Sequence, residues 1–261
     1  MAFSLSFAMV LGLVSQTAKT EAARDKAAER LDFMKGSLKA HSVHPRSDPK
    51  IIYKLQSKPV MRFTNPVGTV KDGAIFVWTS DFDRPEVAVQ IFLHNDGGWF
   101  QEFSSLSTEP LSADRPWHAN RGGVELKPIP GAPKPAETAE LRLRQIRALT
   151  GEFAAEEQFE QKTWQKLRIL TKPFARYGKP GTPIIDGVLL ACVLTTDPEV
   201  YLMIEARDGK DGPEWQYAFA PASIDPIRGF WKKKEVWKLP YREAWTDSSA
   251  PFYVWGFSQE P

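Results

Sequence analysis

The chain has little of the material from which common metal and disulfide sites are built. Cysteine occurs once, at Cys192, and histidine four times in 261 residues. A single cysteine excludes an intrachain disulfide and a cysteine-based zinc cluster. The close histidines His41 and His44 would need a third ligand such as Asp48, from a loop that contains Pro45. We therefore expect no bound metal and no cofactor.

Motifs of the familiar enzyme classes are absent as well. The chain contains no G-x-S-x-G, H-E-x-x-H or G-x-G-x-x-G pattern and no P-loop. Residues 208–212 resemble a calcium loop but lack its closing glutamate, so a hairpin turn is favoured. Cys192 lies within the apolar run LLACVLT, which favours a buried core thiol over a nucleophile.

A strong charge of either sign is missing too. The formal net charge is +2, and acidic and basic residues are interspersed. This balance gives no argument for a nucleic-acid partner. The triplet at 232–234, KKK, favours a solvated loop, with an anion-binding patch as the alternative.

No apolar run is long enough to cross a membrane comfortably. The run at 2–14, AFSLSFAMVLGLV, suits the apolar core of a signal peptide. No lysine or arginine precedes it, and the alternative is an apolar start to the first helix. The pattern predicts a signal peptide over about 1–18, an extracytoplasmic location (periplasmic or secreted) and no transmembrane span.

What the chain does contain is one stretch that occurs twice. Residues 58–73, KPVMRFTNPVGTVKDG, and 172–187, KPFARYGKPGTPIIDG, match at a constant offset of 114. Chance would give about one identity over such a window. The identical pairs are Lys58/Lys172, Pro59/Pro173, Arg62/Arg176, Pro66/Pro180, Asp72/Asp186 and Gly73/Gly187. We interpret this as an internal duplication.

Each copy has the same predicted order of elements, a helix followed by four strands. The helices are expected at 19–38 and 137–157, and the strands near 51–59, 74–80, 87–94 and 99–106, then 164–176, 188–196, 200–207 and 215–222. Short connections require antiparallel pairing, and the amphipathic helix is the expected cover of each sheet's apolar face. The predicted fold class is α+β: a tandem duplication of an α-ββββ unit, a curved antiparallel sheet packed on one helix in a cystatin/NTF2-like architecture.

The predicted domain organisation follows from the two copies. Repeat 1 occupies 19–126, a proline-rich linker 127–136, repeat 2 137–245 and an aromatic C-terminal tail 246–261, of which 252–257 can add one more strand.

The two copies also indicate which sheet face can specialise. Strands 87–94 and 200–207 are aliphatic on one face in both copies, which predicts the core. On the divergent face we place four candidate binding residues: His94, Glu102, Glu205 and Arg207. The repeated arginines Arg62 and Arg176 are expected to pair with Asp72 and Asp186 as a fold requirement, with anion binding as the alternative.

Several phrases resemble an uncharacterised family of exported planctomycete proteins built from two related units. They include RFTNPVGTVKDGAIFVW, EFSSLS, DGVLLACVLTTDPEVYLMIEAR and EWQYAFA. The resemblance covers most of residues 50–240 and implies an exported protein with two units. It carries no known function, and it therefore implies no site residues.

Three functions remain open from the sequence. The first is a non-catalytic exported binding or scaffold protein that uses sheet faces or the inter-repeat groove, with an unknown protein or small ligand as its partner. The nine tryptophans suit such an interface. The second is an enzyme with a site in a sheet concavity, and the third is a cell-envelope structural protein.

Overall fold

The computed structural model describes residues 24–258 apart from residues 67, 115, 210 and 211. The predicted signal peptide at 1–18 lies outside the described residues. The chain divides into two compact units, 1–40 and 41–261, and each is described by itself. Within the described ranges, no helix combines the length and the apolar character needed to cross a membrane.

The described part of the first unit is a helix at residues 24–39. It is rich in alanine, glutamate, lysine and arginine, which are strong helix formers. Lys35 lies 3.4 Å from the carboxylate of Asp32, one turn earlier. The predicted helix over 19–38 is confirmed for its described residues, and its role as the cover of the first sheet stays a prediction.

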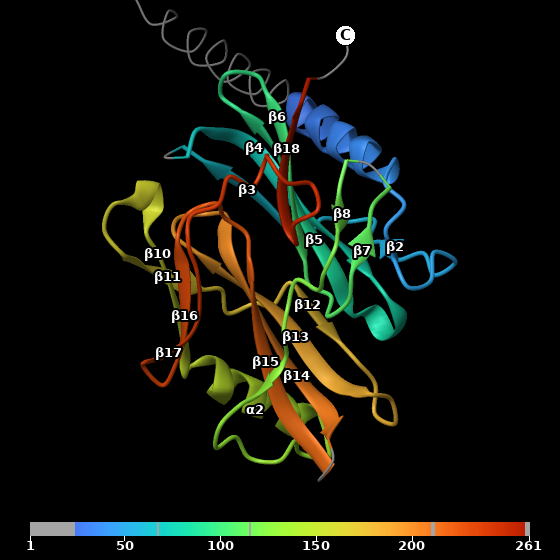
Figure 1. Cartoon of the computed structure of the whole chain (residues 1–261), viewed down its shortest axis with the longest axis vertical. Helices are drawn as coiled ribbons and strands as arrows, with labels where there is room; N and C mark the ends of the chain where they lie inside the picture. The colour runs from blue at the N-terminus through green and yellow to red at the C-terminus, as the bar shows by residue number, and fades with distance from the viewer. Residues whose placement is uncertain (1–23, 67, 115, 210–211, 259–261) are drawn as a thin grey trace, which may run out of the picture. The chain divides into compact units, whose positions relative to one another are not determined.

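The second unit contains a six-stranded antiparallel sheet built from the first copy and the C-terminal tail (Figure 1). Its strand order is β18-β6-β5-β4-β2, and β3 also pairs with β4. The strands are β2 (Lys54–Leu55), β3 (Met61–Asn65), β4 (Val70–Thr79), β5 (Pro85–His94), β6 (Trp99–Ser105) and β18 (Phe252–Phe257). The tail strand predicted at 252–257 therefore exists, and it joins the sheet of the first copy.

A nine-stranded antiparallel sheet is built mainly from the second copy, in the order β17-β16-β10-β11-β13-β14-β15-β9, with β12 also paired to β13. Its strands are β9 (Lys127–Pro128), β10 (Phe153–Glu157), β11 (Gln165–Ile169), β12 (Ala175–Tyr177), β13 (Ile184–Val193), β14 (Pro198–Gly209), β15 (Gly212–Pro221), β16 (Ile227–Trp231) and β17 (Lys234–Leu239). The helix α2 (Ala139–Thr150) precedes them. Short elements complete the unit: β1 (His44–Pro45), β7 (Leu111–Ser112), β8 (His118–Ala119) and the 3-10 turns η1 (Asp81–Asp83) and η2 (Phe159–Gln161).

The strands that carry the repeated stretch pair with the same register in both copies. Phe63 lies opposite Gly73, and Tyr177 lies opposite Gly187. A Cβ atom on either glycine would lie 2.6 Å from the facing aromatic ring. Glycine is required at both positions because that ring covers the backbone.

The repeated arginines do pair with the repeated aspartates. In each copy the Nε–Oδ1 distance is 3.0 Å and the Nη2–Oδ2 distance is 2.7 Å, for Arg62 with Asp72 and for Arg176 with Asp186. This bidentate geometry ties the short strand to the start of the long one. The second copy adds Arg142 from α2, whose Nε lies 2.9 Å from Asp186.

The helix of the second copy is shorter than its predicted span, 137–157. Thr138 caps its first turn through a bond from the backbone N–H of Leu141, and Gly151 follows its last residue. Residues 153–157 instead form β10, where buried and more exposed positions alternate. The Ala-Ala-Glu-Glu sequence favours a helix, but these residues form a strand because β10 pairs with both β11 and β16.

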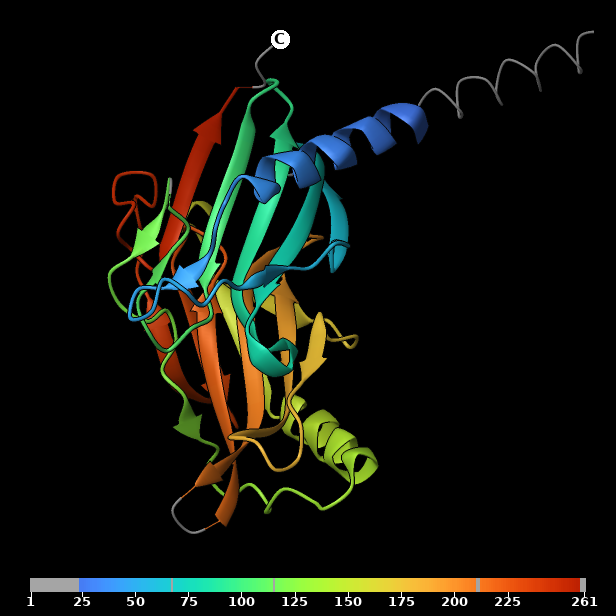
Figure 2. The same cartoon turned by 90° about the vertical axis from the view of Figure 1, so that its right-hand side faces the viewer.

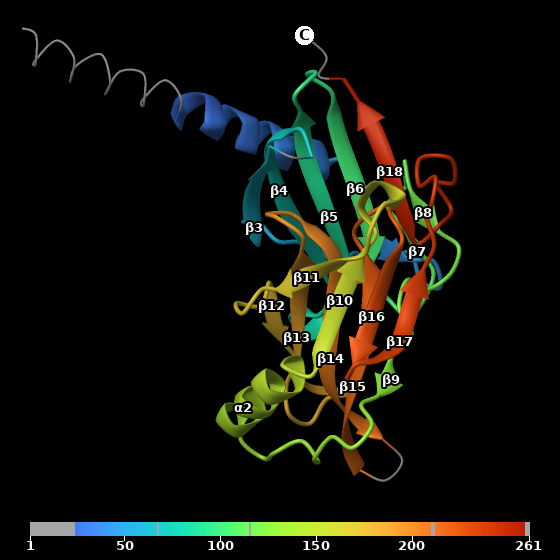
Figure 3. The ribbon, with the colours of Figure 1, turned by 90° about the vertical axis from the view of Figure 1, so that its left-hand side faces the viewer.

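The expectation that a helix alone covers the apolar face of the second sheet is wrong. Ile146 and Leu149 of α2 do belong to the same core cluster as Ile204. However, the sheet also curls over on itself, so that β10, β16 and β17 lie over β15 (Figure 3). The ring centroids of Phe153 and Tyr217 are 5.0 Å apart, and Phe219 stacks on Trp237 at 5.4 Å. The curled part resembles half of a barrel.

The divergent faces of the two copies meet in one shared core. Val77, Ala88 and Leu106 from the first copy belong to the same cluster as Tyr201 and Met203 from the second. In Figure 2 the green and teal first sheet and the orange second sheet come together in the middle of the view. We call this contact the seam.

The segment 127–136, predicted as a linker, is attached along its length to the second copy. Its residues 127 and 128 pair with β15 as β9. Ile129 is buried in the core, and Gln145 of α2 bonds to the backbone of Lys134 and Ala136 at 2.8 Å each. These contacts fix the proline-rich stretch.

The assignment of Ile204 to the buried face of β14 gives a first testable prediction. Ile204 is fully buried, and truncation to alanine is expected to lower the free energy of unfolding by about 2–5 kcal/mol. Ile52, which is 57% exposed, is the matched control and should lose under about 0.5 kcal/mol on the same change. Urea denaturation of both variants measures this. Similar losses at the two positions would contradict the register.

Candidate functional site

The four residues predicted for the divergent face do not form one site. Glu205 and Arg207 are brought together, with Nη1 of Arg207 2.6 Å from Oε2 of Glu205. Glu102 instead contacts Gln90, whose Nε2 lies 3.0 Å from its carboxylate. His94 lies near the end of β5, where its Nδ1 is 3.0 Å from Asp96.

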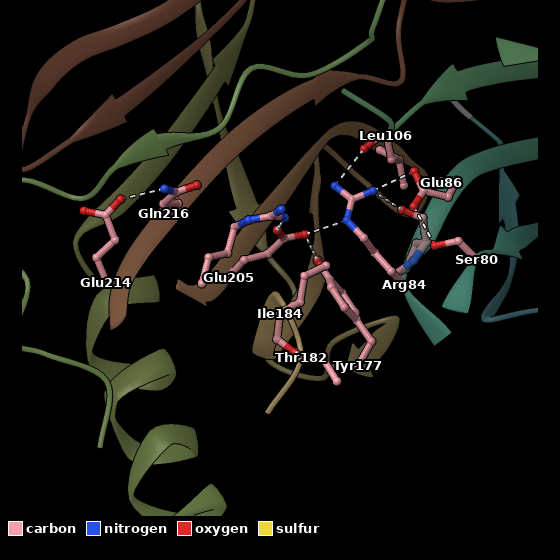
Figure 4. A network of polar contacts seen from close by, with 12 residues as sticks. Ser80, Arg84, Glu86, Leu106, Tyr177, Thr182, Ile184, Glu205, Glu214 and Gln216 are labelled. Atoms are coloured by element: carbon pink, nitrogen blue, oxygen red, sulfur yellow. Dashed lines mark hydrogen bonds and ion pairs between the residues drawn. The ribbon is translucent and has the colours of Figure 1, made fainter. Parts of the chain in front are cut away.

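Glu205 belongs to a buried ion-pair network across the seam (Figure 4). Arg84, just before β5, places its Nε 3.0 Å from Glu205 and its Nη1 2.7 Å from Glu86. The hydroxyl of Tyr177 donates to Glu205 at 2.9 Å. Although burial lowers the pKa of Arg84, the carboxylates of Glu205 and Glu86 raise it above its ordinary value. Each charge here has an opposite partner, which is the pattern of a structural clamp.

A second polar feature at the seam consists of acidic side chains. Four carboxyl groups lie close enough to interact electrostatically. They belong to Glu102, Glu157, Asp197 and Glu199. In the described part of the chain, no lysine or arginine forms an ion pair with any of them. We call these four residues the carboxyl cluster.

Burial shifts the titration of the carboxyl cluster toward neutral pH. Burial, reinforced by Asp197, raises the pKa of Glu102 to about 8. Burial also raises the pKa of Glu157 to about 7 and, together with Glu157, holds the pKa of Glu199 well above its usual range. Over the described residues, no three acidic, histidine or cysteine side chains are arranged to hold a metal ion. Burial therefore favours the protonated forms of Glu102, Glu157 and Glu199.

An aromatic cleft lies elsewhere in the second unit, where the segment 121–127, β15, β17 and the start of β18 meet. Its volume is about 310 Å³. Aromatic side chains from three strands line it: Tyr217, Phe219, Trp237 and Phe252. Apolar walls of this kind suit the body of a small organic molecule, and the volume is at the lower end for ligand sites.

One half-buried charged side chain, Arg242, lines the aromatic cleft. Its Nη2 donates to the carbonyl of Ser223, and its Nη1 lies 3.4 Å from the carbonyl of Pro240. Its guanidinium carbon is 5.3 Å from the ring of Phe252. Burial lowers the pKa of Arg242 to about 10, and no carboxylate opposes that shift.

A larger cavity of about 550 Å³ lies beneath α2. Its walls are mostly aliphatic and aromatic, from Leu143, Ile146, Phe153, Leu167, Val188 and Leu190. The charged residue that lines it, Arg147, is exposed. Because a specific site combines apolar walls with placed polar groups, the aromatic cleft is the better candidate.

Sequence reasoning did not identify the cleft residues. Trp237 and Phe252 were visible as aromatics, but they are separated from Tyr217 in sequence and meet it only through the curl of the sheet. Arg242 stands in the irregular stretch LPYREAW, which carries no motif. The one sequence feature that pointed toward such a site was the high tryptophan content, nine residues in 261. None of the four predicted residues lines the aromatic cleft or the cavity beneath α2.

The carboxyl cluster predicts how stability depends on pH. The pKa of Glu102 is about 8 when folded and about 4.3 when unfolded, so the folded state binds more protons between these values. The free energy of unfolding is therefore expected to fall as pH rises from about 5.5 to about 8.5. Glu102→Gln should flatten this slope, whereas the exposed control Glu243→Gln should keep it.

Urea unfolding at pH 5.5, 7.0 and 8.5 measures the effect. A free energy of unfolding that rises with pH over this window in the wild type, or an identical slope in Glu102→Gln, would contradict the assignment.

Comparison with known proteins identifies no family for this chain. No protein-family model, no curated protein and no solved structure matches this chain.

Proposed function

We propose that this protein is a non-catalytic binding protein and that the aromatic cleft holds a small, mainly apolar ligand. The observation that carries the proposal is the convergence of four aromatic side chains around a cavity of about 310 Å³. Aromatic walls give much contact area for little conformational entropy, because each ring has few rotatable bonds.

The arrangement of titratable groups favours binding over catalysis. A general base or nucleophile must lie within hydrogen-bond reach of the bound substrate. Two groups of titratable side chains lie at the seam, and neither is placed to act on a ligand. In one group the charges are paired with each other, as Arg84 is with Glu205. In the other, burial raises the carboxyl pKa, as it does for Glu102. Neither Glu102 nor Glu205 lines the aromatic cleft.

Two further parts of the proposal concern origin and location. We infer that the two halves arose by tandem duplication of an α-ββββ unit of cystatin/NTF2-like type, which the equal register and the equal arginine–aspartate geometry support. We also propose export through the apolar run at 2–14, which agrees with a lone cysteine that is fully buried.

Binding of a neutral aromatic probe tests the function. 2-Naphthylmethanol is expected to quench the fluorescence of the wild type and to bind at least about 10-fold more weakly to Trp237→Ala, which removes one wall of the cleft. Trp245→Ala is the matched control, because Trp245 is 51% exposed and lies outside the cleft.

A second variant separates lost binding from lost folding. Val236→Phe fills the cleft without removing an aromatic wall, and it should also abolish binding while the protein keeps its cooperative thermal transition. Unchanged affinity in both cleft variants would overturn the proposed function.

A further inference from the structure

Resting on the proposed function, we infer that the ligand of the aromatic cleft carries an anionic group, a carboxylate or a phosphate, and that Arg242 binds it. The ligand would therefore be an amphipathic molecule, with a flat apolar body against the aromatic walls and its charge at the guanidinium. The inference depends on how Arg242 differs from the other buried and half-buried arginines within residues 41–258.

The other buried and half-buried arginines within residues 41–258 are each matched by a carboxylate. Nη2 of Arg228 lies 2.6 Å from Glu156, and Nε of Arg142 lies 2.9 Å from Asp186. Arg207 and Arg84 follow the same rule. Arg242 does not: among the described residues, no acidic side chain lies within ion-pair distance of it, and it contacts only backbone carbonyls and a ring.

The guanidinium of Arg242 also has one N–H donor without an acceptor. Nε of Arg242 is buried and has no hydrogen-bond partner. A buried donor without a partner lowers stability, and more so when it belongs to a charged group. Nε and one Nη form the fork that binds a carboxylate or phosphate through two parallel hydrogen bonds. A bound anion would supply both the missing charge and the missing acceptor.

The surroundings hold the guanidinium in place for such a ligand. Bonds to the carbonyls of Ser223 and Pro240 fix two of its nitrogens, and the ring of Phe252 lies 5.3 Å from its central carbon. A side chain that is already fixed loses less conformational entropy on binding. The other basic residues that line the cleft, Arg121 and Lys127, are exposed, and Lys127 lies 3.1 Å from Glu125. Glu125 also lines the cleft and offsets the charge of Lys127, so these exposed residues do not form the site.

The experiment compares three probes with the same aromatic body. 2-Naphthoate, 2-naphthyl phosphate and neutral 2-naphthylmethanol are titrated into the full-length wild type at 0.15 M salt, with affinity measured by calorimetry. At least one anion is expected to bind at least 10-fold more tightly than the alcohol. The ratio between naphthoate and naphthyl phosphate then identifies the carboxylate or the phosphate as the preferred head group.

Variants locate the charge that is responsible. Arg242→Gln should remove the preference for the anion while affinity for the alcohol stays within about 2-fold of the wild type. Arg144→Gln is the control, because Arg144 is exposed and lies outside the cleft, and this change should alter the preference less than 2-fold. If Arg242→Gln does not fold, Arg242→Lys tests the same point, since it keeps the charge but lacks the fork and should reduce the preference.

The outcomes separate this inference from the proposed function. Equal affinity of the wild type for the alcohol and for both anions would overturn the role of Arg242 and leave the cleft a site for neutral ligands. A preference for the anion that persists in Arg242→Gln would overturn the assignment of the residue. Absence of binding by all three probes would overturn both.

Discussion

The second unit depends on one buried ion pair, between Arg84 of the first copy and Glu205 of the second, at 3.0 Å. Glu205 is fully buried, and Arg84 also pairs with Glu86 while Glu205 pairs with Arg207, so removal of either partner would leave unequal numbers of positive and negative charges in the buried network. Each copy supplies one of the two charges, and the divergent faces of both copies are buried in the shared core at the seam. This mutual dependence explains why residues 41–261 form one compact unit although the sequence repeats.

Features that occur in both copies and features that occur once have different roles. The bidentate pairs Arg62–Asp72 and Arg176–Asp186 recur with the same geometry, because each copy must tie its short strand to a long one. The short strands β1, β7 and β8 pair in the same order as β10, β16 and β17, so the curl of the second sheet has a smaller counterpart in the first copy. The tail strand β18 joins the first sheet. The aromatic cleft is built from β15, β17, the segment 121–127 and the start of β18. The cleft thus depends on the C-terminal tail, which occurs once in the chain.

Features of the fold could be predicted from the sequence where the residues that determine them are close in sequence or repeated. The long strands could be located from apolar runs, and the arginine–aspartate pairs from the repeat, because both signals are local or duplicated. The strand β10 was missed, since its Ala-Ala-Glu-Glu sequence favours a helix until β11 and β16 pair with it. The divergent face was taken for a binding surface, yet Glu205 is fully buried there. Burial at the seam and the contacts of Arg242 depend on segments far apart in sequence, which no local pattern reveals.

The two polar features with unusual titration are connected through one residue. The hydroxyl of Ser223 donates to Glu157 of the carboxyl cluster at 2.6 Å, and its carbonyl accepts a hydrogen bond from Arg242 in the aromatic cleft. One residue thus contacts a carboxyl group with a pKa of about 7 and the guanidinium that the ligand would meet. Ionisation of Glu157 would strengthen its bond from the Ser223 hydroxyl, because charged acceptors bind more strongly than neutral ones. Ser223 therefore joins the carboxyl cluster at the seam to the aromatic cleft through its side chain and its carbonyl.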